Sequence, residues 1–157
     1  MTATLVAKNV AGGFAHRTLF EGVDLTVRPG GHVYLLDGDV TAMSITPSLP
    51  DTEDLTARYQ RWHADRGNDL RVGRQLATLV RAAGLEVRDF RGWFEMGALP
   101  PGVRGPAWAA RDALVAAGLA GSEDLARWEA AHAAMDTWEP RPEYAFATFA
   151  VVARRPA

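Results

Sequence analysis

The most informative segment of the sequence is Tyr144-Ala145-Phe146-Ala147-Thr148-Phe149-Ala150-Val151-Val152. Apolar residues occupy its odd and even positions alike, whereas a strand with one wet face alternates apolar and polar residues. We therefore expect a strand that is buried on both faces and central in its sheet. The run His32-Val33-Tyr34-Leu35-Leu36 has the same pattern, so a second doubly covered strand is expected there, ending at Asp37-Gly38-Asp39.

Helices should connect these strands, because apolar residues recur at helical spacing between them. Leu55, Tyr59 and Trp62 share one face of a helix that Asp51 or Thr52 caps. Further helices are expected at 72–84, 106–118 and 122–139, and a third strand at 85–90. Strands that alternate with helices indicate an α/β protein.

The first 27 residues predict a β-hairpin. Leu5–Val10 is a strand candidate, Ala11-Gly12-Gly13 is a turn signal, and apolar residues alternate with polar ones over 23–27. The turn Arg28-Pro29-Gly30-Gly31 ends this segment. At this turn the chain divides into residues 1–27 and residues 28–157.

The amino-acid composition excludes several classes of binding partner and functional site. The 157 residues include 17 basic and 19 acidic side chains, and the net charge of −2 gives no reason to expect binding to nucleic acid or to an anionic membrane. The absence of cysteine excludes thiolate metal sites and cysteine nucleophiles, and no metal site of another kind is expected. With no apolar run of about 18 residues and no signal peptide, a cytoplasmic location is expected.

From Arg28 onward, the order of elements resembles the C-terminal half of a class I S-adenosylmethionine-dependent methyltransferase. The residues that carry the resemblance are the turn at 28–31 with its strand, the passage Leu76–Val87 from helix to strand, and the closing strand Tyr144–Arg154. The resemblance implies a partial Rossmann-like sheet whose antiparallel last strand, 144–152, inserts between 32–36 and 85–90. It also implies a small-molecule acceptor and S-adenosylmethionine as the methyl donor.

The chain departs from that family where the cofactor should bind. The family holds S-adenosylmethionine with a glycine-rich loop after its first strand and an acidic residue at the end of its second strand. Neither feature is present before Arg28, so no cofactor-binding residue can be named. We expect the chain alone to be weakly active or inactive as a methyltransferase.

Residues 5–10 and 14–27 are similar instead to the opening of an ABC-type ATPase domain, in which Phe14 would correspond to the aromatic residue that stacks on adenine. The phosphate loop of that family is replaced by Asp37–Ile45, which has no lysine and too few glycines. One alternative function is therefore an ATP-binding remnant without hydrolysis. Another is a non-catalytic binding or dimerisation module, in which a second copy of the chain covers the edge of the unfinished sheet.

Several side chains are candidates for the acceptor site. His63 and His132 could act as the base that deprotonates an acceptor, although His132 also fits a packed core histidine. Asp37 and Asp39 follow a buried strand, where ligands of open α/β sheets collect, but a hydrated turn would favour the same residues. The substrate-binding set is completed by Arg66, Asn68, Asp69, Arg71 and Arg74, in a loop that closes over the pocket in the resembling enzymes, and by Trp62 and Trp93, which could line the pocket or pack in the core.

Overall fold

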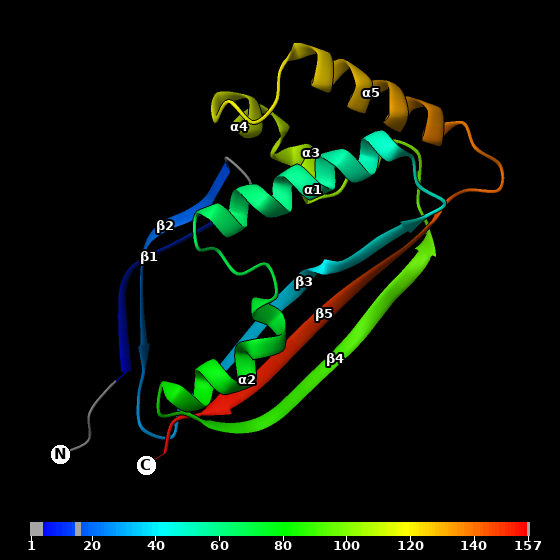
Figure 1. The fold of residues 1–157 in the computed structure, drawn as a ribbon. Helices are drawn as coiled ribbons and strands as arrows, with labels where there is room; N and C mark the ends of the chain where they lie inside the picture. The colour runs from blue at the N-terminus through cyan, green and yellow to red at the C-terminus, as the bar shows by residue number, and fades with distance from the viewer. Residues whose placement is uncertain (1–4, 15–16, 157) are drawn as a thin grey trace.

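Three strands form the main sheet (Figure 1). The computed structural model describes residues 5–14 and 17–156. Within them, β3 (His32–Thr46), β5 (Glu143–Arg154) and β4 (Glu86–Ala98) lie side by side in that order, and β5 is antiparallel to both neighbours. β3 and β4 therefore run parallel to each other. The predicted α/β class is confirmed, as are the predicted place and direction of the last strand.

Both faces of β5 are covered over its second half, as its apolar sequence predicts. Ala150 and Val151 are neighbours along the strand, so their side chains point to opposite faces, and both are buried. On the face of Val151, Leu76 and Val80 of helix α2 (Val72–Ala82) pack against the sheet. The sheet therefore has its main apolar contact on its central strand.

β3 lies at an edge of the sheet, and the predicted cover on both of its faces is wrong. Tyr34 and Leu36 are 61% and 55% exposed. Among the described residues, β3 is hydrogen-bonded to β5 alone, so no strand lies on its outer side. Nor does the strand end at Asp37-Gly38-Asp39, because it continues to Thr46 after an irregularity between Asp39 and Ser44.

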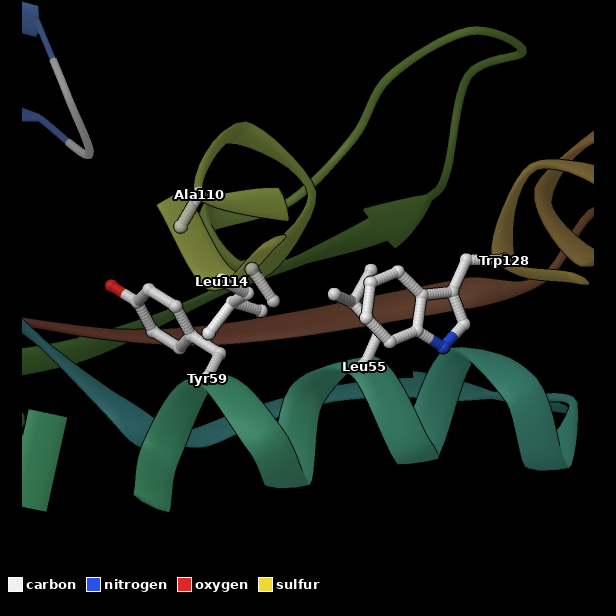
Figure 2. Close-up of a cluster of buried hydrophobic side chains, with 6 residues drawn as sticks. Leu55, Tyr59, Ala110, Leu114 and Trp128 are labelled. Carbon is white, nitrogen blue, oxygen red and sulfur yellow. The ribbon is translucent and has the colours of Figure 1, made fainter. Parts of the chain in front are cut away.

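Four helices form a second layer, namely α1 (Pro50–Asp65), α3 (Pro106–Ala109), α4 (Arg111–Ala116) and α5 (Ser122–Asp136). Their shared core is apolar (Figure 2). Leu55 and Tyr59 of α1 pack with Leu114 of α4 and Trp128 of α5, all of them buried. The predicted apolar face of α1 is thus confirmed, whereas the single helix expected at 106–118 is divided at Ala110.

The start of α1 differs from the prediction. Its N-cap is Leu49, whereas Asp51 and Thr52, the predicted caps, lie in the first turn. Pro50 occupies the first helical position, which suits proline because an N–H would have no partner there. The Thr52 hydroxyl accepts a hydrogen bond from the Leu49 amide (3.2 Å) and donates one to the Leu49 carbonyl (2.8 Å). A side chain of the first helical turn thus bonds to the backbone of the N-cap residue.

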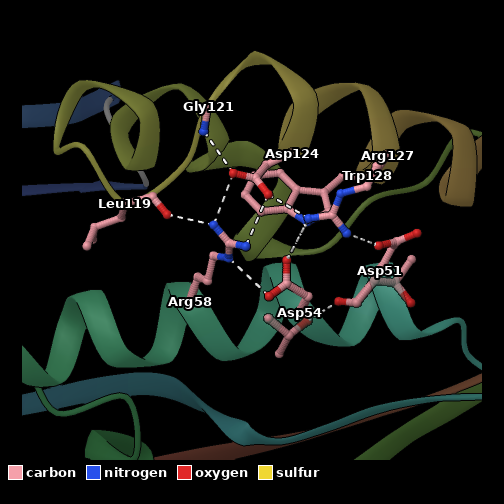
Figure 3. A network of polar contacts seen from close by, with 10 residues as sticks. Asp51, Asp54, Arg58, Leu119, Gly121, Asp124, Arg127 and Trp128 are labelled. Carbon is pink, nitrogen blue, oxygen red and sulfur yellow. Dashed lines mark hydrogen bonds and ion pairs between the residues drawn. The ribbon is translucent and has the colours of Figure 1, made fainter.

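A polar network joins α1 to α5 beside the apolar core (Figure 3). Arg58 donates to Asp54 at 3.0 Å and to both carboxylate oxygens of Asp124 at 3.1 Å. Trp128 Nε1 donates to the other oxygen of Asp54 at 3.0 Å. Burial alone would raise the pKa of Asp54, but the hydrogen bonds from Arg58 and Trp128 lower it overall. The forked geometry of the arginine fixes the orientation of the two helices.

The predicted hairpin is present as a separate sheet, in which β1 (Leu5–Phe14) pairs antiparallel with β2 (Arg17–Val27). The turn predicted at Ala11-Gly12-Gly13 is wrong, because these residues lie within β1, where its register shifts. The side chain of Phe14 lies outside the described part of the structure. Since the described residues of the hairpin are not hydrogen-bonded to β3, the hairpin does not extend the sheet at that edge.

Candidate functional site

A cavity of about 320 Å³ lies at the carboxyl end of β3, between that strand, α1 and the start of α3. We call it the His132 cavity. Small-molecule sites commonly span about 300–1,000 Å³, so its size suits a small ligand. Its walls combine apolar and hydrogen-bonding side chains, among them Met43, Ile45, Thr52, Gln60, Trp108 and His132. Ligands of open α/β sheets collect beyond the carboxyl ends of strands, which makes this cavity the candidate site.

His132 is held in one tautomer by the backbone of its own helix. Its Nδ1 lies 2.8 Å from the carbonyl oxygen of Trp128, four residues earlier in α5, and a carbonyl can only accept, so Nδ1 carries the proton. Nε2 is then the basic nitrogen of the neutral ring, and among the described residues it has no hydrogen-bond donor. Burial lowers the pKa of His132 below its ordinary value, which keeps the ring neutral near pH 7. The histidine therefore offers the cavity a hydrogen-bond acceptor.

Trp108 supplies an aromatic wall next to that histidine. The two ring centroids are 4.7 Å apart and the ring planes meet at 57°. The guanidinium of Arg111 lies 4.6 Å from the Trp108 ring centroid, and this cation–π contact helps to fix the indole. Gln60 also belongs to the cavity wall, and its amide can donate and accept hydrogen bonds.

A second cavity of about 240 Å³ adjoins the first. We call it the Val103 cavity. Leu99, Val103 and Phe146 contribute to its largely apolar wall. The two cavities share three lining residues, Met43, Ile45 and Gly105.

Asp39, a predicted substrate ligand, is fully buried inside β3. Its Oδ1 accepts hydrogen bonds from the Thr41 hydroxyl (2.6 Å) and from the amides of Thr41 (2.9 Å) and Ala42 (3.2 Å). Its Oδ2 forms an ion pair with Arg74 of α2. Asp39 and Arg74 thus hold the irregular stretch of β3 and join the strand to α2. Asp37, by contrast, is exposed, and its Oδ1 accepts the amide of Gly38 at 2.7 Å.

Four of the other predicted residues gather at the end of α1 and line neither cavity, namely Trp62, His63, Arg66 and Asn68. His63 Nδ1 is 3.0 Å from Asn68 Nδ2, its ring meets that of Trp62 edge-on at 4.9 Å, and Arg66 lies 4.2 Å from the Trp62 ring. Burial, together with the positive charge of Arg66, lowers the pKa of His63. These four residues form one packed cluster, in which His63 Nε2 is enclosed and has no hydrogen-bond partner among the described residues.

Asp69 lies in the loop before α2, where it accepts a hydrogen bond from the amide of Arg71 at 2.8 Å. Arg74 lies in α2 itself and not in the predicted loop. Trp93 lies on β4 and is 39% exposed. Among the predicted residues, His132 alone lines a described cavity.

The prediction omitted most of the cavity wall. One signal in the sequence marks part of it: Thr52, Thr56 and Gln60 recur every fourth residue, so they form a polar stripe beside the apolar face of α1. Met43 gives no comparable signal, because its place in the wall depends on contacts between distant segments.

Among the described residues, no strand pairs with the outer side of β3, so no turn between such a strand and a helix reaches the site from there. Asp37–Ile45, which stands in place of an ATPase phosphate loop, is extended strand within β3 and forms no loop around a phosphate.

Within residues 5–14 and 17–156, no three metal-ligating side chains gather, and no helix combines the length and hydropathy of a membrane span. Comparison with known proteins finds no matching family model and no matching curated protein.

Proposed function

We propose that the chain is related to the acceptor-binding half of class I S-adenosylmethionine-dependent methyltransferases and binds a small hydroxylated molecule in the His132 cavity. Its relation to that family is supported by the strand order β3-β5-β4 with an antiparallel central strand. The observation that carries the binding function is the hydrogen bond from His132 Nδ1 to Trp128, which leaves Nε2 as an acceptor. On this account the chain alone transfers no methyl group.

The chemistry of the wall favours an aromatic alcohol. A hydroxyl group can donate to the neutral His132 Nε2, and a flat ring can pack against the indole of Trp108. Met43 and Ile45 offer apolar contacts to the rest of the ring. Phenol is the simplest molecule with these features and serves as the probe.

Phenol binding can be followed by NMR through the imidazole resonances of His132. We expect saturable shifts at His132 and smaller or no shifts at His63, which lies outside the cavity and is the internal control. His132→Gln should weaken phenol binding roughly tenfold, because the loss of a good hydrogen bond in a binding site costs about 1–1.5 kcal/mol. Equal shifts at both histidines, or undiminished binding to the variant, would refute the binding function.

The missing donor site is tested separately by calorimetric titration with S-adenosylmethionine. We expect no heat of binding at micromolar concentrations, because the described residues provide no cradle for the donor. Micromolar affinity would contradict this part of the proposal and leave the phenol experiment unaffected.

A second candidate function is self-association through β3. Its outer edge is unpaired among the described residues, and the exposed segment Tyr34–Leu36 has no charge or proline that would prevent pairing. Two copies related by a twofold axis at Leu35 would place Tyr34 of one copy beside Leu36 of the other. This pairing would extend the sheet and cover both side chains.

A further inference from the structure

Met43, Ile45 and Gly105 line both cavities and so lie between them. Met43 comes from the irregular stretch of β3, and it faces the backbone of Gly105, the N-cap residue of α3. A Cβ atom at Gly105 would lie only 3.1 Å from Met43 Cε and 3.5 Å from Sδ. The thioether thus packs closely on a residue that has no side chain of its own. Methionine is unbranched and has three rotatable side-chain bonds, so it can move aside more readily than a branched or aromatic residue.

The two cavities differ in chemistry. The His132 cavity offers an imidazole acceptor and the amide of Gln60. The Val103 cavity is lined mainly by hydrocarbon, including Leu99, Val103 and Phe146.

Two charged side chains also line the Val103 cavity, and neither makes it a site for an ion. Both terminal nitrogens of Arg104 donate to the carboxylate of Asp136, at 3.0 and 2.5 Å, so its charge is already neutralised. Glu95 is exposed to solvent and can keep its hydration.

We propose that the two cavities form one elongated site for an amphipathic molecule, with a hydroxyl-bearing aromatic head in the His132 cavity and a short saturated hydrocarbon chain in the Val103 cavity. Met43 is the partition that such a ligand displaces. This inference rests on the proposed function, because it assumes that the head group binds beside His132. It adds the class of ligand and the direction in which the ligand extends.

The test compares phenol with 4-hexylphenol, which carries the same head and a six-carbon chain. We expect 4-hexylphenol to bind at least tenfold more tightly than phenol, because burial of each methylene group is favourable. The methyl resonances of Met43 and Val103 should shift with 4-hexylphenol, and those of Val103 should not shift with phenol. Equal affinities for the two compounds would overturn the inference while leaving the proposed function intact.

Three protein variants test where the hexyl chain of 4-hexylphenol binds. Val103→Gln should bring the affinity for 4-hexylphenol close to that for phenol and leave phenol binding unchanged; Val103 is 48% exposed, so the variant should fold. Met43→Ala removes the partition but also part of the apolar wall around the head, so the ratio of the affinity for 4-hexylphenol to the affinity for phenol should rise. Phe94→Gln is the matched control, because Phe94 is a 61% exposed residue of β4 outside both cavities. If Phe94→Gln loses affinity for 4-hexylphenol and Val103→Gln does not, the hexyl chain binds beside Phe94 on β4 and not in the Val103 cavity. That result would refute the inference.

If phenol fails to shift His132 at all, the proposed function fails and this inference falls with it. If phenol binds but the hexyl chain adds no affinity, the inference fails alone. The two failures are therefore distinguished within one set of titrations.

Discussion

Trp128 of α5 donates its indole N–H to the carboxylate of Asp54 in α1, 3.0 Å away, while the rest of its side chain is completely buried. One residue thus fills the apolar core and also ends the polar network beside it. The same α5 carries His132 one turn later, with its Nδ1 on the carbonyl of Trp128. The packing that orders α5 is therefore also what positions the acceptor nitrogen of the candidate site.

Trp128→Phe tests this dual role. The variant removes the hydrogen bond to Asp54 and leaves unfilled volume in the core, so we expect the free energy of unfolding to fall by about 2 kcal/mol. Urea denaturation measures this loss. The control is Trp93→Phe, at a 39% exposed tryptophan of β4, which should cost much less. Equal losses in the two variants would contradict the role assigned to Trp128.

Asp39→Ala tests the buried carboxylate of β3. It leaves the amides of Thr41 and Ala42 without their acceptor, and Arg74 without its partner, so we expect a loss of stability of about 1–3 kcal/mol. The matched control is Asp37→Ala, two residues earlier, whose exposed carboxylate accepts only the neighbouring amide of Gly38. This change should stay within about 0.5 kcal/mol. If both alanine variants have the same urea midpoint of unfolding as the wild-type protein, Asp39 has no structural role.

Gly73→Ala tests the close packing of α2 on β3. A Cβ atom at this position would lie 2.7 Å from the carbonyl oxygen of Gly38 and 2.8 Å from that of Asp37, so the helix must move outward. We expect a destabilisation of about 1–3 kcal/mol, although alanine is the better helix former. Thr78→Ala, at an exposed position of the same helix, should be neutral or slightly stabilising. A Gly73→Ala protein as stable as wild type would show that α2 does not approach the strand so closely.

His132 gives a pH-dependent prediction. Its pKa in the folded protein lies below the ordinary value of 6.5, mainly because the ring is buried. As the pH falls below about 6.5, the unfolded chain binds a proton at this residue before the folded chain does, so folding stability must fall. Above that pH both states are neutral here and His132 makes no contribution.

Two measurements test whether the pKa of His132 is lowered and whether folding stability falls with pH for that reason. An NMR titration should place the midpoint of His132 below 6.5, and the loss of unfolding free energy between pH 7.5 and pH 5.5 should be smaller in His132→Gln than in wild type. A midpoint above 6.5 would mean that the folded protein stabilises the charged form of the ring. His132 Nε2 would then carry a proton and could not accept a hydrogen bond from a ligand.

Self-association is tested by sedimentation velocity over a range of concentrations. Pairing of β3 with a second copy predicts a sedimentation coefficient that rises with concentration in wild type and stays at the monomer value in Leu36→Lys, since lysine on an edge strand opposes pairing. Leu79→Lys changes a comparably exposed leucine on α2 and should behave like wild type. A wild-type protein that remains monomeric at every concentration would contradict this second function.

The sequence predicts the central strand well and its neighbour poorly, for a physical reason. Consecutive buried residues such as Ala150 and Val151 need apolar side chains at odd and even positions, and that requirement is visible in β5. Tyr34 and Leu36 follow the same pattern, but they lie at an edge that no described strand covers. Edge or centre depends on which strands are present elsewhere, and a local pattern does not contain that information.

The candidate site was predictable only in part. His132 follows from helical spacing on α5, which places it on the same face as Trp128. Asp39 resembles a turn residue because Gly38 precedes it, yet the strand continues through both. The contact of Met43 with Gly105 joins residues from distant parts of the chain, so it exists only once β3 and α3 have been brought together.

A crystal structure of the protein soaked with phenol would show whether the His132 cavity binds an aromatic alcohol. We expect phenol in the His132 cavity, with its oxygen about 2.6–3.2 Å from Nε2 of His132 and its ring against Trp108. Phenol ordered elsewhere, or a cavity filled by the protein's own side chains, would contradict it.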